Sequence, residues 1–341
     1  MKQAAQNQHY VPKFILRNFL CDENHQRVRV YDKETDREFT TSIDNVMAER
    51  RFNEFEFGEY LASFEDIACR IEDSALPAYR QVLADGKLSG GPDQQAALAF
   101  LMAFQFVRTR AHRQHWADLE LTIREKIEAI GGRIEDVPGY EELTENNLKK
   151  QHLLSLQKSI VEFGPHIAMK HFVLFKAAEG RSFYLGDNPV TMHNDEDHGP
   201  YGNIGLAVRG IQIYMPLSAK FAVGALCPTL LDKMRDQIEE GRRERQIATA
   251  NAVRRGKITI DQLVRLKEQI RPFEDDAELL VSRYAAGGPV TCTNDVMDFI
   301  NSLQTLYARR FVICKHSHLT LARRHNREFP KFRKGMRIRA S

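Results

Sequence analysis

A histidine and a tyrosine stand near the start of the chain, in the segment "NQHYVPKFIL" of residues 7–16. His9 could give or take a proton, because an unperturbed imidazole titrates close to neutral pH. Tyr10 would act from the opposite side of an extended segment. The alternative is a structural lock, in which Pro12 fixes the backbone and His9 binds a carbonyl. Both interpretations stay open, and His9 and Tyr10 are our first catalytic candidates.

A carboxylate and an amide follow the apolar residues of "FYLGDNPV", residues 183–190. Strand ends commonly present catalytic acids. Asp187 could orient an imidazole, accept a proton or hold a metal, and Asn188 could donate to a substrate oxygen. The alternative is an Asx-type turn, in which Asp187 only accepts hydrogen bonds from backbone amides. We expect the pair at a strand end in either case.

Two segments of helical character carry polar side chains at helical spacing. Gln105, Arg108 and His112 recur at three and four residues, so we expect them on one face of a long helix. The guanidinium group of an arginine can bind two phosphate oxygens at once. Beside a histidine, it could support phosphoryl transfer without a metal. The alternative is a solvated face. Asn301 and Gln304 are three apart and could read a base edge or bridge two helices.

Two sets of acidic residues could bind a metal ion. The loop "HNDEDH" of residues 193–198 holds two histidines and three acids, but no recognised ligand spacing fits, which favours a polar surface loop. Glu65 and Glu72 are seven apart and, with Asp187, could form an acidic nuclease centre. Salt bridges on a helix surface are the alternative. No cofactor is predicted, and a divalent metal is left open.

The net charge of +3 conceals a basic C-terminal tail. Residues 315–339 contain nine basic side chains and one acid, Glu328, so the rest of the chain carries −5. Phe329, Phe332 and Met336 alternate with these cations, which supplies charge for phosphates and faces for bases. The alternative is a tail that docks on the acidic body. The nucleic-acid-binding candidates are Arg323, Arg324, Arg327, Lys331, Arg333 and Lys334.

The elements that must position these groups can be read from periodicity and turn residues. Alternation around a Lys-Glu-Thr-Asp turn predicts a hairpin over 27–43. We expect helices over 63–86, 91–132 and 141–172, the first either continuous or broken near Pro77 and the last with a break at Gly164-Pro165. Short β-branched and aromatic runs predict strands within 172–194 and 210–227. Charged helices with a break at Gly256 follow, and a capped helix then runs into a strand that ends at 314.

The fold class that follows is α+β, a helix-rich domain packed around a modest, mainly antiparallel sheet. We treat 1–341 as a single elaborated domain: 1–62 holds the N-terminal motif and hairpin, 63–170 the helical part, 171–314 the mixed sheet and helices, and 315–341 the basic tail. Apolar runs are shorter than a bilayer requires and the N-terminus lacks a signal-peptide core, so we expect a cytoplasmic protein without membrane contact. The five cysteines form no CxxC pair, which speaks against a disulfide framework.

Four motifs in one order carry a family resemblance: "QHYVPKFILRNF", "YLGDNPV", "YMPLSAKFAV" and "FINSLQTLYARRFVI". Together they resemble the bacterial domain-of-unknown-function family numbered 4238, over nearly the whole chain. Ala219 stands where a second proline is expected after "PLS". The resemblance implies no activity. It implies that the family-motif positions include His9, Tyr10, Pro12, Arg17, Phe19, Asp187, Asn188, Pro189, Pro216, Leu217, Asn301 and Gln304, with Gln105 and Arg108 alongside.

The first functional hypothesis is a nuclease-like phosphodiesterase that acts on RNA, with toxic effector activity in phage defence as a setting by analogy. His9 would be the acid or base, Asp187 would orient it, and the tail would capture nucleic acid. One alternative is a non-catalytic nucleic-acid- or nucleotide-binding regulatory module, and another is a small-nucleotide hydrolase. The catalytic candidates are His9, Tyr10, Arg108, Asp187 and Asn301; the substrate-binding candidates are Arg17, Gln105, His112, Asn188 and Gln304.

Overall fold

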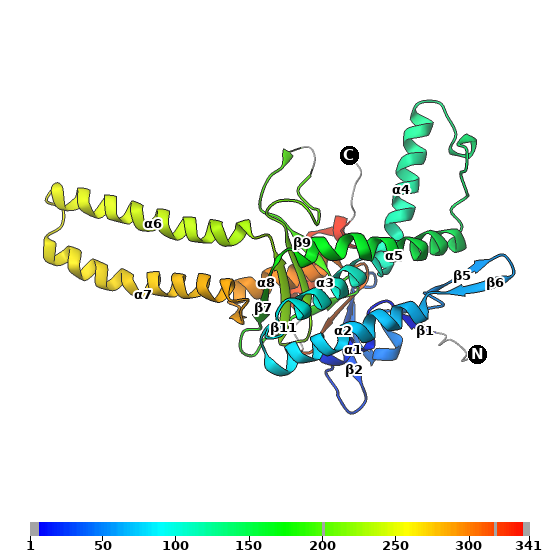
Figure 1. Cartoon of the computed structure of the whole chain (residues 1–341), viewed down its shortest axis with the longest axis horizontal. Helices are drawn as coiled ribbons and strands as arrows, with labels where there is room; N and C mark the ends of the chain where they lie inside the picture. Colours follow the sequence, from blue (N-terminus) through cyan, green and yellow to red (C-terminus); the bar gives the residue numbers. More distant parts are fainter. Residues whose placement is uncertain (1–6, 200–201, 317–318, 337–341) are drawn as a thin grey trace.

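The computed structural model describes residues 7–199, 202–316 and 319–336. Small, mostly antiparallel sheets pack among helices in a central body, and a pair of long helices extends from one side of it (Figure 1). Helices make up 53% and strands 17% of the structure. The predicted α+β class is therefore confirmed.

The N-terminal part forms three small antiparallel strand pairs. β1 pairs with β4 and so joins the first motif to residues some forty positions later. The hairpin predicted over 27–43 is confirmed as β2 and β3, which pair antiparallel. The elements are β1 (Asn7–His9), α1 (Lys13–Leu16), η1 (Arg17–Phe19), β2 (Arg27–Asp32), β3 (Arg37–Ser42), η2 (Ile43–Asn45), β4 (Ala48–Arg50), β5 (Glu54–Phe57) and β6 (Tyr60–Ser63).

The helical part consists of α2 (Glu65–Asp85), α3 (Gly91–Val107), α4 (Arg110–Ala129), η3 (Ile134–Asp136) and α5 (Glu145–Ala168). The prediction of one helix over 91–132 is wrong. Thr109 is extended, with φ −80° and ψ 159°, and its hydroxyl accepts a hydrogen bond from the amide of His112, so a second helix begins there. The expected single face of Gln105, Arg108 and His112 is therefore divided between two helices.

The break predicted at Gly164-Pro165 is also wrong, because α5 continues to Ala168. Helix α5 packs closely on α3 at this point. A Cβ atom at position 164 would lie 2.6 Å from the ring of Phe100, so only glycine allows this approach. Packing of α5 on the body thus overrides the local preference of proline to end a helix.

The residues predicted as one central sheet belong to two. The larger sheet has the order β12-β7-β11-β10-β9 and the smaller has the order β3-β2-β13-β8, and only the β12–β7 pair is parallel. β8 leaves its neighbours in sequence and pairs with β13, which brings the DNPV motif beside the end of the capped helix. The strands are β7 (His171–Lys176), β8 (Tyr184–Gly186), β9 (Thr191–His193), β10 (Gln212–Pro216), β11 (Phe221–Leu226), β12 (Val290–Thr291) and β13 (Phe311–Cys314).

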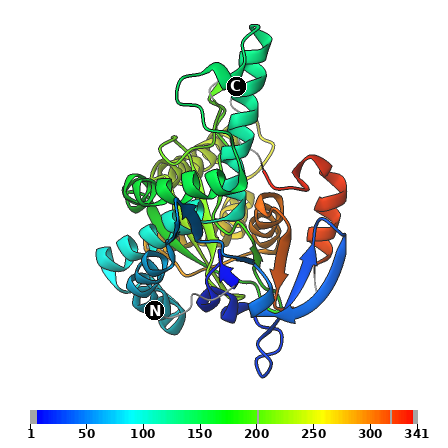
Figure 2. The same cartoon turned by 90° about the vertical axis from the view of Figure 1, so that its right-hand side faces the viewer.

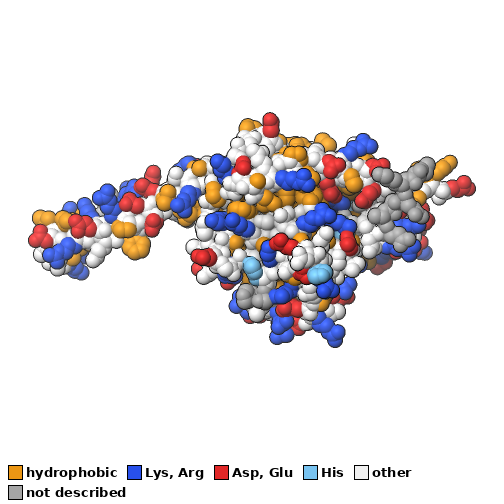
Figure 3. Space-filling model, turned by 90° about the horizontal axis from the view of Figure 1, so that it is seen from below, with side chains coloured by type: hydrophobic (Ala, Val, Ile, Leu, Met, Phe, Trp, Pro, Cys, Tyr) orange, Lys and Arg blue, Asp and Glu red, His pale blue; other side chains and the backbone are white. Residues whose placement is uncertain are grey.

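A helical arm formed by α6 (Thr229–Arg254) and α7 (Ile260–Ala285) projects from the larger sheet (Figure 1). Each helix has 26 residues, which corresponds to a length of about 39 Å. Ion pairs between Arg242 and Glu278 and between Arg245 and Glu274 join the two helices. Charged side chains of both signs and scattered hydrophobic ones cover the arm (Figure 3). The predicted charged helices with a break at Gly256 are confirmed.

The C-terminal elements are α8 (Asn294–Tyr307), α9 (Thr320–Glu328) and η5 (Pro330–Phe332). Thr293 caps α8 and β13 follows it, which confirms the predicted capped helix and strand. Helix α9, drawn in red, lies beside the blue β2–β3 hairpin (Figure 2). Among the described residues, no helix combines the length and the apolar character needed to span a bilayer.

A buried histidine, His152, holds the break between α3 and α4 against α5. Its Nε2 donates to the carbonyl of Val107 at 2.8 Å, and its Nδ1 accepts a hydrogen bond from Nε of Arg113 at 3.2 Å. This pairing requires the neutral ring, and burial lowers the pKa of His152 to about 3. The break between α3 and α4 is therefore stabilised by an imidazole that stays neutral well below the ordinary pKa of histidine.

Acidification is expected to destabilise the protein through His152. The unfolded chain binds a proton below the ordinary imidazole pKa of 6.5, whereas the folded ring does not until about pH 3, so stability falls as the pH drops below 6.5. Between pH 7 and pH 5 the loss is about 2 kcal/mol. Urea unfolding at both pH values should show a smaller loss in His152→Gln than in the parent. His25→Gln, at an exposed site, should keep the parent's loss, and an unchanged slope in His152→Gln would contradict the assignment.

Candidate functional site

A cavity of about 520 Å³ in the body is lined almost entirely by cations. We call it the arginine cleft. Its lining comes from four segments that are distant in sequence: the β2–β3 turn, the start of α4, the α8–β13 connection and the residues after η5. Five cations and one acid therefore converge on a volume that could hold a phosphate group and its neighbours. The lining residues are Glu34, Arg110, Arg309, Arg310, Arg333 and Lys334.

Asp187 of the DNPV motif fixes the backbone from which two of these arginines extend. Its Oδ1 accepts a hydrogen bond from the amide of Arg309 at 2.7 Å, and its Oδ2 accepts from the amides of Arg310 and Phe311 at 2.9 and 3.1 Å. Burial raises the pKa of Asp187, and the amide donors and the nearby ammonium of Lys33 act in the opposite direction. The side chain thus caps backbone amides, although of a distant segment rather than of its own turn.

The next motif residue, Asn188, holds the helix break at the other side of the cleft. Its Oδ1 accepts a hydrogen bond from the hydroxyl of Thr109 at 3.1 Å. Thr109 also caps α4, whose first residue is Arg110. Arg110 is exposed and lies 3.8 Å from Glu49. The DNPV motif therefore positions three arginines of the cleft without lining it.

A buried lysine that the sequence analysis did not identify connects the β2–β3 turn to the end of α8 and to η5. Lys33 is 1% exposed, and its Nζ donates to the carbonyls of Thr305, Ala308 and Phe332 at 2.6, 2.5 and 2.8 Å. Burial lowers the pKa of Lys33 to about 8. Its own carbonyl accepts from Nε of Arg333 at 3.0 Å. Lys33 was read only as a turn residue, and nothing in "YDKETD" distinguishes a buried lysine from an exposed one.

Positive charge remains in excess at the cleft. Arg310 pairs with Asp32 at 2.9 Å and lies 3.5 Å from Glu34, and the bond to Asp32 raises the pKa of Arg310. Arg309 donates to the amide oxygen of Gln114 at 3.4 Å. No acid of the described residues lies within ion-pair distance of Lys334. Arg110 and Arg310 are thus engaged by acids, whereas no described acid forms an ion pair with Arg333 or Lys334, so an anion would be attracted into the cleft.

The N-terminal candidates lie outside the cleft and bind the protein's own backbone. The Nε2 of His9, which is 8% exposed, is 2.8 Å from the carbonyl of Ile43, and burial lowers its pKa. Tyr10 is 3% exposed, and its carbonyl accepts from Nε2 of Gln105 at 2.8 Å. Arg108 is 2% exposed and donates to Glu72 and to the carbonyl of His9. These contacts are those of a structural lock, and the catalytic role of these residues stays a prediction.

Asn301 and Gln304 do lie on one helix face, and they bind the backbone of β8 and its continuation. Asn301 accepts from the amide of Tyr184 at 2.8 Å and donates to the carbonyl of Ser182. Gln304 accepts from the amide of Gly186 at 2.9 Å and donates to the carbonyl of Pro189. The pair therefore bridges helix and strand. This arrangement leaves the amides no free edge for a base.

The other predicted groups are scattered. Arg17 is exposed in η1, and His112 lies within α4, where burial lowers its pKa to about 4. Glu72 pairs with Arg108, and Glu65 accepts a hydrogen bond from Asn53. The loop at 193–198 forms internal pairs such as His193 with Asp195 at 2.7 Å. Within the described ranges, no three His, Cys, Asp or Glu side chains gather as a metal site requires.

The basic tail binds largely to the protein itself. Arg323 pairs with Glu38 at 2.7 Å and Arg327 with Asp36 at 3.2 Å, both on the β2–β3 hairpin, while Arg333 donates to the carbonyls of Lys33 and Glu34. Arg324 and Lys331 are exposed, and Lys334 lines the cleft. Arg337 and Arg339 lie outside the described residues. Three of the six candidate cations thus bind the body of the protein, as the alternative interpretation of the tail expects.

Comparison with known proteins gives one match. The model of a family described as "Protein of unknown function (DUF4238)" matches residues 7–318, which include the HYVP, DNPV and ARRFVI segments. No curated protein and no solved structure matches the chain. Because the match spans nearly all of the sequence, the chain belongs to the DUF4238 family.

Proposed function

We propose that the protein is a nucleic-acid-binding module that holds the phosphates of single-stranded RNA in the arginine cleft. The observation that carries the proposal is the convergence of five cations from four distant segments on one cavity. Arginine forks bind phosphate oxygens in pairs, and a basic groove that follows the backbone is the usual means of binding single strands. The exposed cations Arg324 and Lys331 of the tail would extend this surface.

The proposal favours binding over cleavage because the proton-transfer candidates have other partners. His9 and Asp187 are buried and bonded to backbone groups, whereas a catalytic acid or base must reach its substrate. Cleavage of RNA by His9 and Asp187 stays a prediction. The bacterial cytoplasm and phage defence are the proposed setting, the latter by analogy alone.

Binding is expected to depend on the cleft rather than on overall charge. The assay is fluorescence anisotropy with a labelled single-stranded RNA of about 16 nucleotides, between about 50 and 200 mM salt. Arg110→Gln/Lys334→Gln should weaken binding at least about tenfold and reduce the salt slope by about 1.4, because two phosphate contacts are lost. Both side chains are exposed, so the variant should fold.

The matched control is Lys257→Gln/Arg265→Gln, which removes the same charge from exposed sites of the arm region. It should bind RNA as the parent does. Equal weakening in both variants would show that the attraction is diffuse, and absence of binding by the parent would contradict the proposal outright. The RNA is recovered and sized after the assay, and fragments that the cleft variant does not produce would favour the nuclease hypothesis over a binding module.

A further inference from the structure

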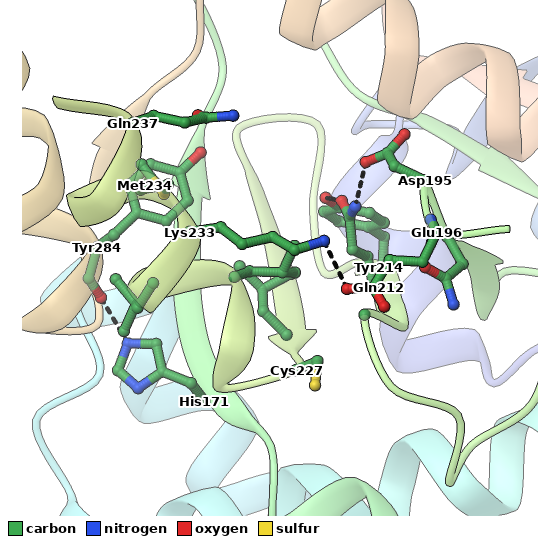
Figure 4. Close-up of a pocket in the computed structure, with 15 residues that line it drawn as sticks. His171, Asp195, Glu196, Gln212, Tyr214, Cys227, Lys233, Met234, Gln237 and Tyr284 are labelled. Carbon is green, nitrogen blue, oxygen red and sulfur yellow. Dashed lines mark hydrogen bonds and ion pairs between the residues drawn. The ribbon is translucent and has the colours of Figure 1, made fainter. Parts of the chain in front are cut away.

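A second cavity, of about 310 Å³, lies where the arm joins the larger sheet (Figure 4). The loop after β9 and strand β10 form one wall, and α6 and α7 form the other. Its volume is at the lower end of the range for sites that enclose small molecules. None of its lining residues belongs to the arginine cleft. The cavity therefore needs its own explanation.

The walls differ in chemical character. Leu226, Leu230, Leu231 and Met234 supply apolar surface, and the ring of Tyr284 supplies a flat face beside the largely buried ring of Tyr214. Asp195 and Gln212 stand at the opposite side and are joined by a hydrogen bond of 2.9 Å (Figure 4). A ligand that fits must have a flat, largely apolar body with polar groups along one edge.

The polar groups retain capacity to bind a ligand. The carboxylate of Asp195 accepts from His193 and Gln212, and its side chain is still 70% exposed, so further lone pairs face solvent and the cavity. The described residues provide no hydrogen-bond partner for the amide of Gln237 or the hydroxyl of Tyr284. Both acceptors and donors are thus available, as the edge of a nucleobase requires.

The charges that line this cavity disfavour an anionic ligand. Asp195 and Glu196 both line it, whereas Lys233 is the only lysine or arginine among its described lining residues. Lys233 is already paired with Glu196 at 2.5 Å. Arg209, outside the lining, also lies 3.7 Å from Glu196. A phosphate group would therefore meet the carboxylate of Asp195 and a lysine that is already paired, in contrast to the arginine cleft.

We infer that this cavity binds a neutral purine nucleoside, whose base stacks on Tyr284 and donates its N–H edge to Asp195. Guanine suits the site best, because its Watson–Crick edge presents two adjacent N–H donors to a carboxylate. The ligand would contact β10, the loop after β9 and both arm helices. It would therefore join the base of the arm to the body.

Calorimetric titration of the whole protein with guanosine, adenosine, cytidine and guanosine monophosphate tests the inference. We expect guanosine to bind most tightly, and the monophosphate to bind at least about tenfold more weakly than guanosine because of its charge. Asp195→Asn should weaken guanosine binding about tenfold, and Tyr284→Phe, which removes only a hydroxyl, about threefold to fivefold. Asp236→Asn, an exposed site on α6 outside the cavity, should bind as the parent does.

Hydrogen exchange supplies a second readout. Bound guanosine should slow amide exchange in the first turns of α6 and the last turns of α7, and leave the tip of the arm unchanged. The inference fails if no nucleoside binds at about 1 mM, if Asp195→Asn binds guanosine like the parent, or if the monophosphate binds more tightly. Because this site shares no residue with the arginine cleft, these outcomes are independent of RNA binding.

Discussion

Asp187→Asn is expected to lower the free energy of unfolding by about 3 kcal/mol and to weaken RNA binding several-fold in the protein that remains folded. The carboxylate accepts hydrogen bonds from three successive amides, those of Arg309, Arg310 and Phe311. An asparagine has one acceptor oxygen, which can serve two of them, and its NH₂ group would face the third donor. One buried N–H then loses its partner, and the carbonyl-like oxygen binds the other two less strongly.

The loss of affinity follows from the position of the arginines. Arg309 and Arg310 line the cleft, and their backbone is fixed by Asp187, so a shift of the segment displaces both guanidinium groups. Asp187 would thus be a positioning residue, which does not itself touch RNA. Urea unfolding gives the stability and anisotropy at low temperature gives the affinity. The control, Asp73→Asn at an exposed site of α2, should change neither.

The result also separates a structural from a catalytic Asp187. A catalytic carboxylate in a stable site could be replaced with little loss of stability and complete loss of turnover. A loss of less than about 1 kcal/mol would contradict the capping role, because removal of one charged acceptor from three amides costs more than that. Unchanged RNA affinity in a destabilised variant would uncouple the motif from the cleft.

Local patterns in the sequence predicted the elements that local interactions determine. The β2–β3 hairpin follows from alternation around a turn, and α8 with β13 follows from a threonine cap and an apolar run. The charged arm helices are also confirmed, because their periodicity and the glycine between them are contained in one stretch of chain. The class of the fold follows from these elements.

The errors arise where distant contacts decide. The end of α3 depends on Asn188, which binds Thr109 from 79 residues away, and Gly164 allows α5 to pack on Phe100 and continue through a proline. Composition identified a basic tail, but the acids that hold it, Asp36 and Glu38, are nearly three hundred residues away in the hairpin. Short-range periodicity contains none of this information.

The arginine cleft was missed for the same reason. Its cations come from four segments, and only their three-dimensional arrangement shows that they converge. The motif "YLGDNPV" was predicted to supply catalytic and substrate-binding residues, whereas Asp187 and Asn188 bind groups of the protein behind the cleft. The two adjacent arginines of "LYARRFVI" could have indicated the cleft. Two like charges side by side repel each other, so an anion or several acids must lie nearby to balance them.

Arg108→Leu is expected to cost about 3–5 kcal/mol, the largest stability loss among these substitutions. Arg108 is 2% exposed, and it donates to the carboxylate of Glu72 and to the carbonyl of His9 at 2.6 Å. Its guanidinium also lies 4.8 Å from the centre of the Phe104 ring. Removal of the arginine leaves a partly buried carboxylate without its cation and a buried carbonyl without its donor.

A double-mutant cycle with Glu72 distinguishes the two losses. Arg108→Leu/Glu72→Leu also removes the carboxylate that lost its cation. Its free energy of unfolding should therefore be about 1–2 kcal/mol higher than that of Arg108→Leu alone. The unpaired carbonyl of His9 remains in both variants, so recovery should be incomplete. Arg80→Leu, an exposed arginine of α2, is the matched control and should change the free energy of unfolding by less than about 0.5 kcal/mol.

The cycle also tests what the early histidine does. If Arg108 and His9 have only a structural role, Arg108→Leu should lower the free energy of unfolding. The fraction of the variant that folds should keep its RNA affinity, because neither residue lines the cleft. If Arg108 instead stabilises phosphate charge during cleavage, Arg108→Leu would retain its stability and lose turnover, and the second substitution would restore nothing. The two mechanisms thus predict opposite changes in the same two measurements.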